Sequence, residues 1–308
     1  MALLSTRGFR EWPASRAAGQ RAPYSGAGGA KEPTIDDALR TLRALPPLSL
    51  VATYLLQQVS KENIAFSKLA DVIRSDAPLS ADMLRIANSA LVSPRVPVTG
   101  VQHALAMLGL HRVRALITTA ALKNLVGPAH GTPALARCWR HNLACAFLAD
   151  EAAGKCALDR DFAYTAGLLH DIGRLVMMRA WRNRYAAFLD SAQPDAPALL
   201  PLERREFGIP HTRAGFALLQ DWKLPGIFAE VADRHHNPSA PGSADVLAVV
   251  QFSCGFADTL GFCAVDSPAA EQEPDPPPPL RHLIPGTLHE IHARVAARIS
   301  ALECCLGK

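Results

Sequence analysis

Apolar residues recur at spacings of three and four from Ile35 to the end of the chain, and this period limits the fold more than any other feature. The clearest run is Leu288, Ile291, Val295, Ile299 and Leu302. Such spacing places apolar side chains on one face of an α-helix. No segment shows the apolar and polar alternation of a half-buried strand, and no internal repeat is found. The sequence therefore predicts an all-α fold.

Composition shifts divide this chain into segments. Residues 1–33 follow neither period, contain much Gly, Ala, Ser and Arg, and are expected to be a disordered tail. Residues 34–262 contain helices in series, with one lobe at about 34–128 and another at about 129–262. Residues 263–285 are Pro-rich and acidic, which is typical of an exposed linker. We expect residues 286–308 to form an amphipathic helix that packs on the body or on a partner.

Local signals predict where several helices begin and end. The candidate N-terminal caps are Thr34, Asp36, Ser67, Ser80 and Thr99. Gly109 is expected to end the helix that begins at Thr99. Residues 193–201, QPDAPALLP, are expected to form a loop. Asn88 is expected to cap or bridge helix ends.

Composition also limits the cellular compartment and the kinds of partner that can be expected. At 308 residues and 49% hydrophobic content, the chain can form one large or two medium domains with a buried core. Seven cysteines without CxxC spacing indicate a reducing compartment. The net charge is +4, but +3 of it falls in the first 32 residues, so the basic pI says little about nucleic acid. No apolar run reaches the roughly 18 residues of a membrane span. We expect a cytoplasmic protein.

The segment LLHDIGR places His170 and Asp171 together at the end of an apolar helical stretch. Imidazole and carboxylate can both bind a divalent cation such as Zn, Mn or Fe when a helix end presents them to a cleft. His170 shares a stripe with Ala163, Ala166 and Gly167, whose small side chains allow a helix or a ligand to approach. The dipeptide is common, so its companions decide its meaning.

Two companions lie on predicted inward faces. His141 shares a stripe with Cys138 and Cys145, although a lone histidine there is more often a satisfied core residue. Asp258 follows Cys254 by one turn and is predicted to face inward. A buried carboxylate needs a cation or several hydrogen-bond donors.

Three more histidines widen the set. His211 follows a Gly-Ile-Pro turn, and His235 and His236 end a helix, where the helix dipole gives them an ordinary capping role. Sets of His and Asp spread over more than 100 residues also arise by chance. A metal site and a satisfied helical core both remain open on these residues.

The order His141, His170, Asp171, Asp258 resembles the H…HD…D pattern of the HD superfamily of metal-dependent phosphohydrolases. The segments ALPPLSLVATYLLQQV, LLHDIGRLV, ERREFGIPHTRAGFALLQDWKLP and IFAEVADRHH, with the stretch around Asn88 and Gly109, resemble the HDOD domain. This HD-related output domain occurs in bacterial signalling proteins. The resemblance covers about residues 40–260.

The resemblance implies a regulatory output domain that binds a protein partner or a small ligand without catalysis. The alternative that it implies is a metal-dependent phosphohydrolase acting on a nucleotide or cyclic dinucleotide through a metal-bound water. The implied ligands are His141, His170, Asp171 and Asp258 for a first ion, and Asp171, His211 and His235 or His236 for a second. Arg174 stands where the similar HD-GYP phosphodiesterases have lysine and could contact phosphate, but the GYP signature is absent.

A third hypothesis is DNA binding. Residues 98–117 have the outline of a helix-turn-helix, with Arg112 and Arg114 after the turn. The apolar positions of this segment favour core packing, and its two arginines are expected on a solvated face. We therefore expect no nucleic-acid partner.

Overall fold

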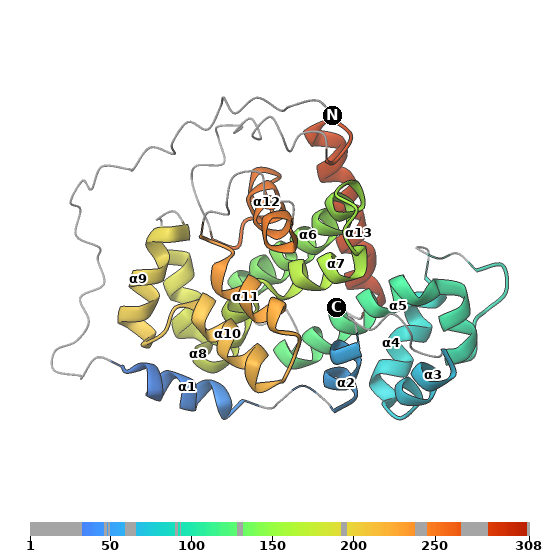
Figure 1. The fold of residues 1–308 in the computed structure, drawn as a ribbon, viewed down its shortest axis with the longest axis horizontal. Coiled ribbons are helices and arrows are strands. Elements are labelled where there is room, and N and C mark those ends of the chain that lie inside the picture. The colour runs from blue at the N-terminus through green and yellow to red at the C-terminus, as the bar shows by residue number, and fades with distance from the viewer. Residues whose placement is uncertain are drawn as a thin grey trace, which may run out of the picture. The chain divides into compact units, whose positions relative to one another are not determined.

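A computed structural model describes most of the chain after Glu32. The described residues are 33–45, 48, 50–58, 66–89, 92, 94–127, 132–191, 196–237, 245–265 and 283–306. Helices connected by turns make up these ranges, and they contain no strand (Figure 1). The predicted all-α fold is confirmed. The predicted tail, except Pro33, and residues 266–282 of the predicted linker lie outside the described ranges.

The helices fall into three groups along the chain. The first group is α1 (Ile35–Arg43), α2 (Leu50–Gln58), α3 (Phe66–Arg74), α4 (Ala77–Ala87) and α5 (Val101–Val126). The second is α6 (Pro133–Lys155), α7 (Arg160–Leu169), α8 (Ile172–Ser191), α9 (Ala196–Phe207), α10 (His211–Asp221), α11 (Gly226–Arg234) and α12 (Val246–Thr259). The third is α13 alone (Leu288–Cys305).

Helix starts follow the sequence signals only in part. Thr34 caps α1, and its side chain accepts a hydrogen bond from the backbone of Asp37, as predicted. Helix α4 starts at Ala77, where Asp76 caps it, so the predicted cap at Ser80 is wrong. Asp76 precedes a proline in the first turn, a favoured start, and Ser80 instead donates to the carbonyl of the preceding helix.

Two other predicted caps are also wrong. Helix α3 begins at Phe66, which places Ser67 inside the helix, and α5 is capped by Gly100 rather than Thr99. The predicted break at Gly109 is confirmed, because this residue has a φ of 75°. Glycine adopts that conformation without a side-chain clash. The two halves of α5 therefore run in different directions.

The predicted loop at 193–201 is wrong from residue 196 onward. Helix α9 occupies residues 196–207 and contains Pro201. Leu199, Glu203 and Phe207 recur every four residues on this helix and are all buried. Packing of that face outweighs the local preference of proline for a turn.

Helix α6 lies at the centre of the second group and packs against α7, α8 and α12 (Figure 1). Helix α10 packs against α8 and α11, while α4 packs against α3 and α5. By their contacts, residues 33–308 form one compact unit. Within this unit α6 contacts α7, α8 and α12, and α10 joins these helices through α8.

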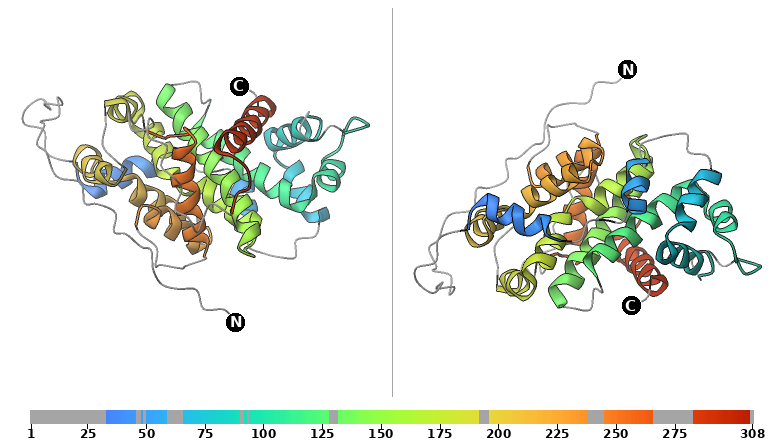
Figure 2. Two further views of the ribbon diagram at one scale, coloured as in Figure 1. Left: turned by 90° about the horizontal axis from the view of Figure 1, so that it is seen from above. Right: turned by 90° about the horizontal axis from the view of Figure 1, so that it is seen from below.

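Helix α13 packs on the body, one of the two alternatives that its amphipathic sequence left open, and contacts both α6 and α4 (Figure 2). Its apolar face is buried, and ion pairs flank that face. Arg294 contacts Glu151 at 2.9 Å, and Glu303 contacts Arg140 at 2.9 Å. Lys123 donates to the carbonyl of Leu306, which joins the end of α13 to α5.

No single helix in the described part of the chain is long and apolar enough to cross a membrane. The two halves of α5 reach that length and apolarity only when taken together, across a bend of 120°.

Asn88 joins the end of α4 to the segment that leads into α5. Its side-chain amide donates to the carbonyls of Leu84 and Val98, and its side-chain oxygen accepts from the backbone of Val98, each at 2.8 Å. These three bonds confirm the predicted bridging role.

We expect Asn88→Ala to lower the free energy of unfolding by about 1–3 kcal/mol, because three hydrogen bonds are lost and two backbone groups lose their partner. Thermal unfolding followed by circular dichroism measures this change. Asn124→Ala, at an exposed position on α5, is the control and should change stability by less than about 0.5 kcal/mol. Equal stability of the two variants would contradict the bridging role.

Candidate metal centre

The His170–Asp171 pair lies at a corner where α7 ends and α8 begins. Gly167 and Gly173 allow this corner to approach α6 and α10 closely. A Cβ on Gly167 would lie 3.0 Å from the Cα of Ala146 in α6. A Cβ on Gly173 would lie 1.8 Å from the carbonyl oxygen of His211 in α10. The absence of side chains at these two positions lets α7 approach α6 and α8 approach α10, and the first of these contacts confirms the close approach predicted for the small residues of α7.

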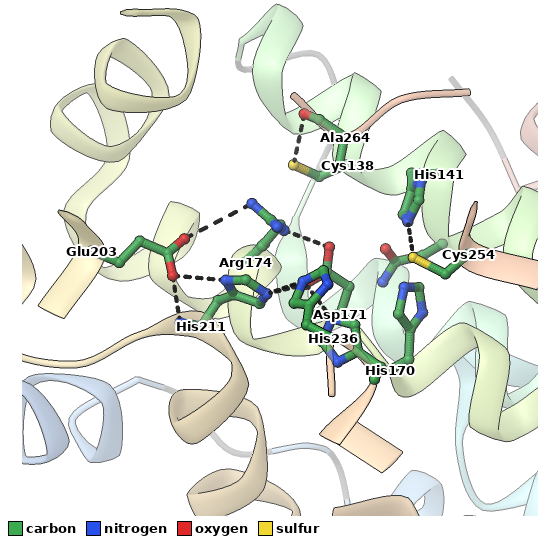
Figure 3. Close-up of polar contacts among 12 residues, drawn as sticks. Cys138, His141, His170, Asp171, Arg174, Glu203, His211, His236, Cys254 and Ala264 are labelled. Atoms are coloured by element: carbon green, nitrogen blue, oxygen red, sulfur yellow. Dashed lines mark hydrogen bonds and ion pairs between the residues drawn. The ribbon is translucent and has the colours of Figure 1, made fainter. Parts of the chain in front are cut away.

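Five histidines converge at this corner. His141 comes from α6, His170 caps α7, His211 begins α10, and His235 and His236 follow α11. Successive ring centroids are close, at 5.3 Å for His141 and His170, 4.9 Å for His170 and His235, and 4.0 Å for His235 and His236. The structure thus brings together all five histidines that the sequence singled out, and Figure 3 shows His141, His170, His211 and His236 among them.

Four of these rings are oriented in the same way. Nδ1 of His141, His170 and His235 lies 2.8, 2.6 and 2.9 Å from the backbone carbonyls of residues 262, 167 and 232. Nδ1 of His211 lies 2.7 Å from the Glu203 carboxylate. Carbonyl and carboxylate oxygens only accept, so Nδ1 carries the proton and Nε2 keeps its lone pair in the neutral ring. Metal-binding histidines are commonly held in this manner.

Only one of the two carboxylate oxygens of Asp171 accepts a hydrogen bond from a described residue. Its Oδ2 accepts from Nε of Arg174 at 2.6 Å, and its Oδ1 lies 3.4 Å from Nε2 of His211 and 3.9 Å from Nε2 of His235. Arg174 also lies 3.8 Å from Glu203. The side chains of Asp171, Arg174 and Glu203 are at most 2% exposed. An internal cation therefore neutralises part of this buried carboxylate pair.

Glu203 completes the buried network. Besides His211 Nδ1, it accepts from the backbone of His211 at 2.8 Å and from the hydroxyl of Tyr185 at 2.6 Å. Burial alone would raise the pKa values of both carboxyl groups. The Arg174 charge and the nearby histidines hold the pKa of Asp171 well below its ordinary value, and contact with His211 lowers the pKa of Glu203. Both groups are charged at neutral pH.

Several buried polar atoms at the centre have no hydrogen-bond partner among the described residues, and three of them are candidate metal ligands. They are Nε2 of His170, Oδ1 of Asp171 and Nε2 of His235. Buried polar atoms are normally satisfied, and these three are all metal-ligand types. Two sets of ligand atoms each lie within 4.8 Å of one another. These sets are His141, His170 and Cys254, and His211, His235 and His236. The residues present therefore fit a divalent metal.

Asp258 does not face inward as predicted. Its side chain is 47% exposed, and its Oδ1 lies 3.3 Å from Nδ1 of His141, which is the nitrogen pointing away from Cys254. A residue four positions along a helix is rotated by about 40°, and at the end of α12 this rotation carries Asp258 to the surface. Cys254 occupies the inward position instead, with its Sγ 3.5 Å from Nε2 of His141.

Sequence reasoning missed three residues of this centre, namely Cys254, Glu203 and Tyr185. Cys254 had a signal, because it shares a helical stripe with Asp258 and follows a largely apolar stretch of sequence. Glu203 also lies near His211 in sequence, but the proline at 201 concealed the helix that carries it. Tyr185 gave no signal beyond its aromatic ring.

Burial lowers the pKa of His170 to about 4, and the Asp171 charge only partly opposes this effect. In the unfolded chain His170 therefore binds its proton near pH 6.5, whereas in the folded chain it does so only near pH 4. The contribution of His170 to the free energy of unfolding is fully present above pH 6.5. It is lost as the pH falls from 6.5 to about 4. We expect denaturant unfolding in chelator to show this loss, with His170→Gln reducing the slope by up to about 1.4 kcal/mol per pH unit.

Exposed His289 on α13 offers the control for this pH series. His289→Gln serves to separate the loss of a histidine at the surface from its loss in the core, and an unchanged slope in His170→Gln would show that His170 is not held neutral.

These features define a class of protein: an all-helical domain with a buried His–Asp centre between its helices. The HDOD domain family matches residues 45–238, and the chain belongs to this family. The match covers α2 to α11 and so includes the His170–Asp171 corner.

Solved structures share the fold. An HDOD domain protein from Geobacter sulfurreducens is 24% identical, with a TM-score of 0.63 over 88% of this chain and 98% of that one. A protein from Shewanella amazonensis SB2B, named provisionally as a phosphohydrolase, is 22% identical, with a TM-score of 0.61 over 87% and 96%. A protein from Marinobacter aquaeolei VT8, named provisionally as a signal transduction protein, is 20% identical, with a TM-score of 0.65 over 91% and 62%.

A curated relative is an uncharacterized protein of Treponema pallidum (strain Nichols). It is 23% identical over 202 residues, which is 64% of this chain and 39% of that protein. The chain thus matches less than half the length of this relative.

Proposed function

We propose that this protein is a non-catalytic regulatory module that acts by binding a protein partner or a small ligand. The observation that carries the proposal is the buried pairing of Asp171 with Arg174. One carboxylate oxygen that a catalytic centre would use is 2.6 Å from a guanidinium nitrogen, and both side chains are 2% exposed. A phosphate ester would have to open the helices to reach Asp171, whereas binding to the outer surface requires no such opening.

The alternative is a metal-dependent phosphohydrolase acting on a nucleotide or cyclic dinucleotide. The unpartnered Nε2 and Oδ1 atoms favour it, because they are suited to hold a metal. His141, His170 and Asp171 would bind on one side, and His211, His235 and His236 on the other. When bound, a divalent ion supplies Lewis acidity and a water of lowered pKa. Arg174 would have to leave Asp171 before it could contact phosphate.

Hydrolysis of a generic phosphodiester, of cyclic di-GMP and of nucleoside phosphates tests the proposal. Each substrate is offered to the wild type and to His170→Gln with added Mn²⁺, Fe²⁺ or Zn²⁺. We expect no turnover in the wild type above that of the variant. Turnover in the wild type that the variant loses would overturn the proposal and establish the phosphohydrolase.

The packing of α5 gives less support to DNA binding. Leu105, Leu108 and Val113 are buried, as predicted for core packing. Arg114 was expected on a solvated face, but it is buried and lies 3.5 Å from Asp161 of α7. A side chain used in this way to join α5 and α7 is not available to a phosphate backbone.

A further inference from the structure

The set formed by His141, His170 and Cys254 lies where three helices meet. His141 belongs to α6, His170 caps α7, and Cys254 belongs to α12. One ring nitrogen from each histidine and the sulfur of Cys254 lie within 4.8 Å of one another. All three residues are buried, at 2%, 1% and 8% exposure. Figure 3 shows both rings beside the sulfur.

Both rings present Nε2 to this set. The proton of His141 Nδ1 is held by the carbonyl of Phe262, and that of His170 Nδ1 by the carbonyl of Gly167. His141 Nε2 faces Cys254, and His170 Nε2 has no hydrogen-bond partner among the residues described. A fully buried lone pair without a partner is energetically unfavourable. This position is therefore suited to a group that accepts an electron pair, such as a metal ion.

Cys254 differs from the two other buried cysteines nearby. The thiols of Cys138 and Cys145 donate to the carbonyls of Ala264 and Val250, each at 3.8 Å. The sulfur of Cys254 is directed instead at an imidazole nitrogen. Sulfur is a soft ligand that suits Zn²⁺, while Mn²⁺ and Mg²⁺ prefer oxygen. A thiolate with two imidazoles is a ligand set found around zinc.

We propose that His141, His170 and Cys254 bind one Zn²⁺ ion, with Cys254 as a thiolate ligand. On binding, the S–H bond of Cys254 breaks, a Zn–S bond forms, and the proton passes to solvent. No oxidant or reductant takes part. The ion ties α6, α7 and α12 together, and this role does not depend on whether the domain is catalytic.

The other histidine set is less suited to zinc. Asp171, which borders His211 and His235, already pairs with the Arg174 guanidinium. That fixed positive charge opposes a second cation in the same buried space. The zinc is therefore assigned to the side of the centre that has the sulfur.

Titration with Co²⁺ tests the assignment, because cobalt replaces zinc and a cobalt–thiolate bond absorbs in the near ultraviolet. The metal-free full chain is titrated with Co²⁺ and then with Zn²⁺. We expect one equivalent of Co²⁺ to produce the sulfur-to-cobalt band and Zn²⁺ to remove it. Cys254→Ser should abolish the band and weaken zinc binding by more than about 100-fold, since even changes beyond the ligands cost about 10- to 100-fold.

Cys145→Ser is the matched control, because Cys145 is also buried but is hydrogen-bonded to a carbonyl, and this variant should keep the band. Cys254→Asp provides a second variant should the serine variant fail to fold. It should bind metal without the band, and its preference should shift from Zn²⁺ toward Mn²⁺. The assignment is overturned if wild type binds no cobalt or zinc, binds cobalt without the band, or keeps the band without Cys254. None of these results bears on the proposed function, since no hydrolysis is measured.

Discussion

Gly173→Ala is expected to lower the free energy of unfolding by roughly 4 kcal/mol or more, or to prevent folding. The first turn of α8 lies directly against the first turn of α10 at this residue. A methyl group here would lie 1.8 Å from the carbonyl oxygen of His211 and 3.0 Å from the backbone nitrogen of Gly215. Both neighbours are backbone atoms, so no side-chain rotation relieves the clash, and the helices must separate. Urea unfolding followed by far-ultraviolet circular dichroism measures the loss.

Gly255→Ala is the matched control for this substitution. Gly255 also lies in a helix, but a Cβ there meets nothing within 4 Å. We expect this variant to be more stable than wild type by about 0.4–1 kcal/mol, because alanine restricts the unfolded chain. If the two alanine variants were equally stable, the contact between α8 and α10 would not be as close as described.

Arg174→Met is expected to cost about 3–5 kcal/mol, the range measured when one partner of a buried ion pair is removed. Methionine fills a similar volume but leaves Asp171 and Glu203 buried without their cation. Arg174→Lys keeps a positive charge but loses the planar guanidinium, so its loss should be smaller than that of Arg174→Met. Thermal and urea unfolding in chelator determine the order of the three proteins.

Arg205→Met is the control for the arginine series. Arg205 forms an exposed ion pair with Glu206, and such pairs contribute about 0–1 kcal/mol. Equal losses at Arg174 and Arg205 would show that the buried carboxylates do not depend on Arg174. Asp171→Ala is a poor probe of metal binding, because it also leaves Arg174 buried without this carboxylate.

Periodicity predicted the helices well wherever the signal was local. The apolar run of α13, the cap at Thr34 and the break at Gly109 all depend on a few neighbouring residues. Helix α9 was missed because its stability comes from burying Leu199 and Phe207 in the body. That contribution depends on distant residues and leaves little trace in the local sequence.

The same distinction applies to the metal centre. His170, His211, His235 and His236 were found because each lies beside a recognisable turn or helix end, and His141 was found from its place on a helical stripe. Cys254 and Asp258 share one helical stripe, and the choice between them was missed because it depends on how the last turn of α12 packs against α6. Glu203 was missed for a similar reason, because its partners Arg174 and Tyr185 approach it from α8. Side chains that act across helices are assigned by packing rather than by spacing.

The packing of α13 on α6 and α4 has a consequence while the protein is being translated. Helix α6 ends at residue 155, but the helix that covers it ends at 305. A ribosome adds about 5–20 residues per second, so the finished α6 waits on the order of ten seconds for its cover. During that interval the surface that α13 will bury is open to chaperones and to other nascent chains. The time at which this surface of α6 becomes buried is therefore set by the translation of α13 rather than by that of α6.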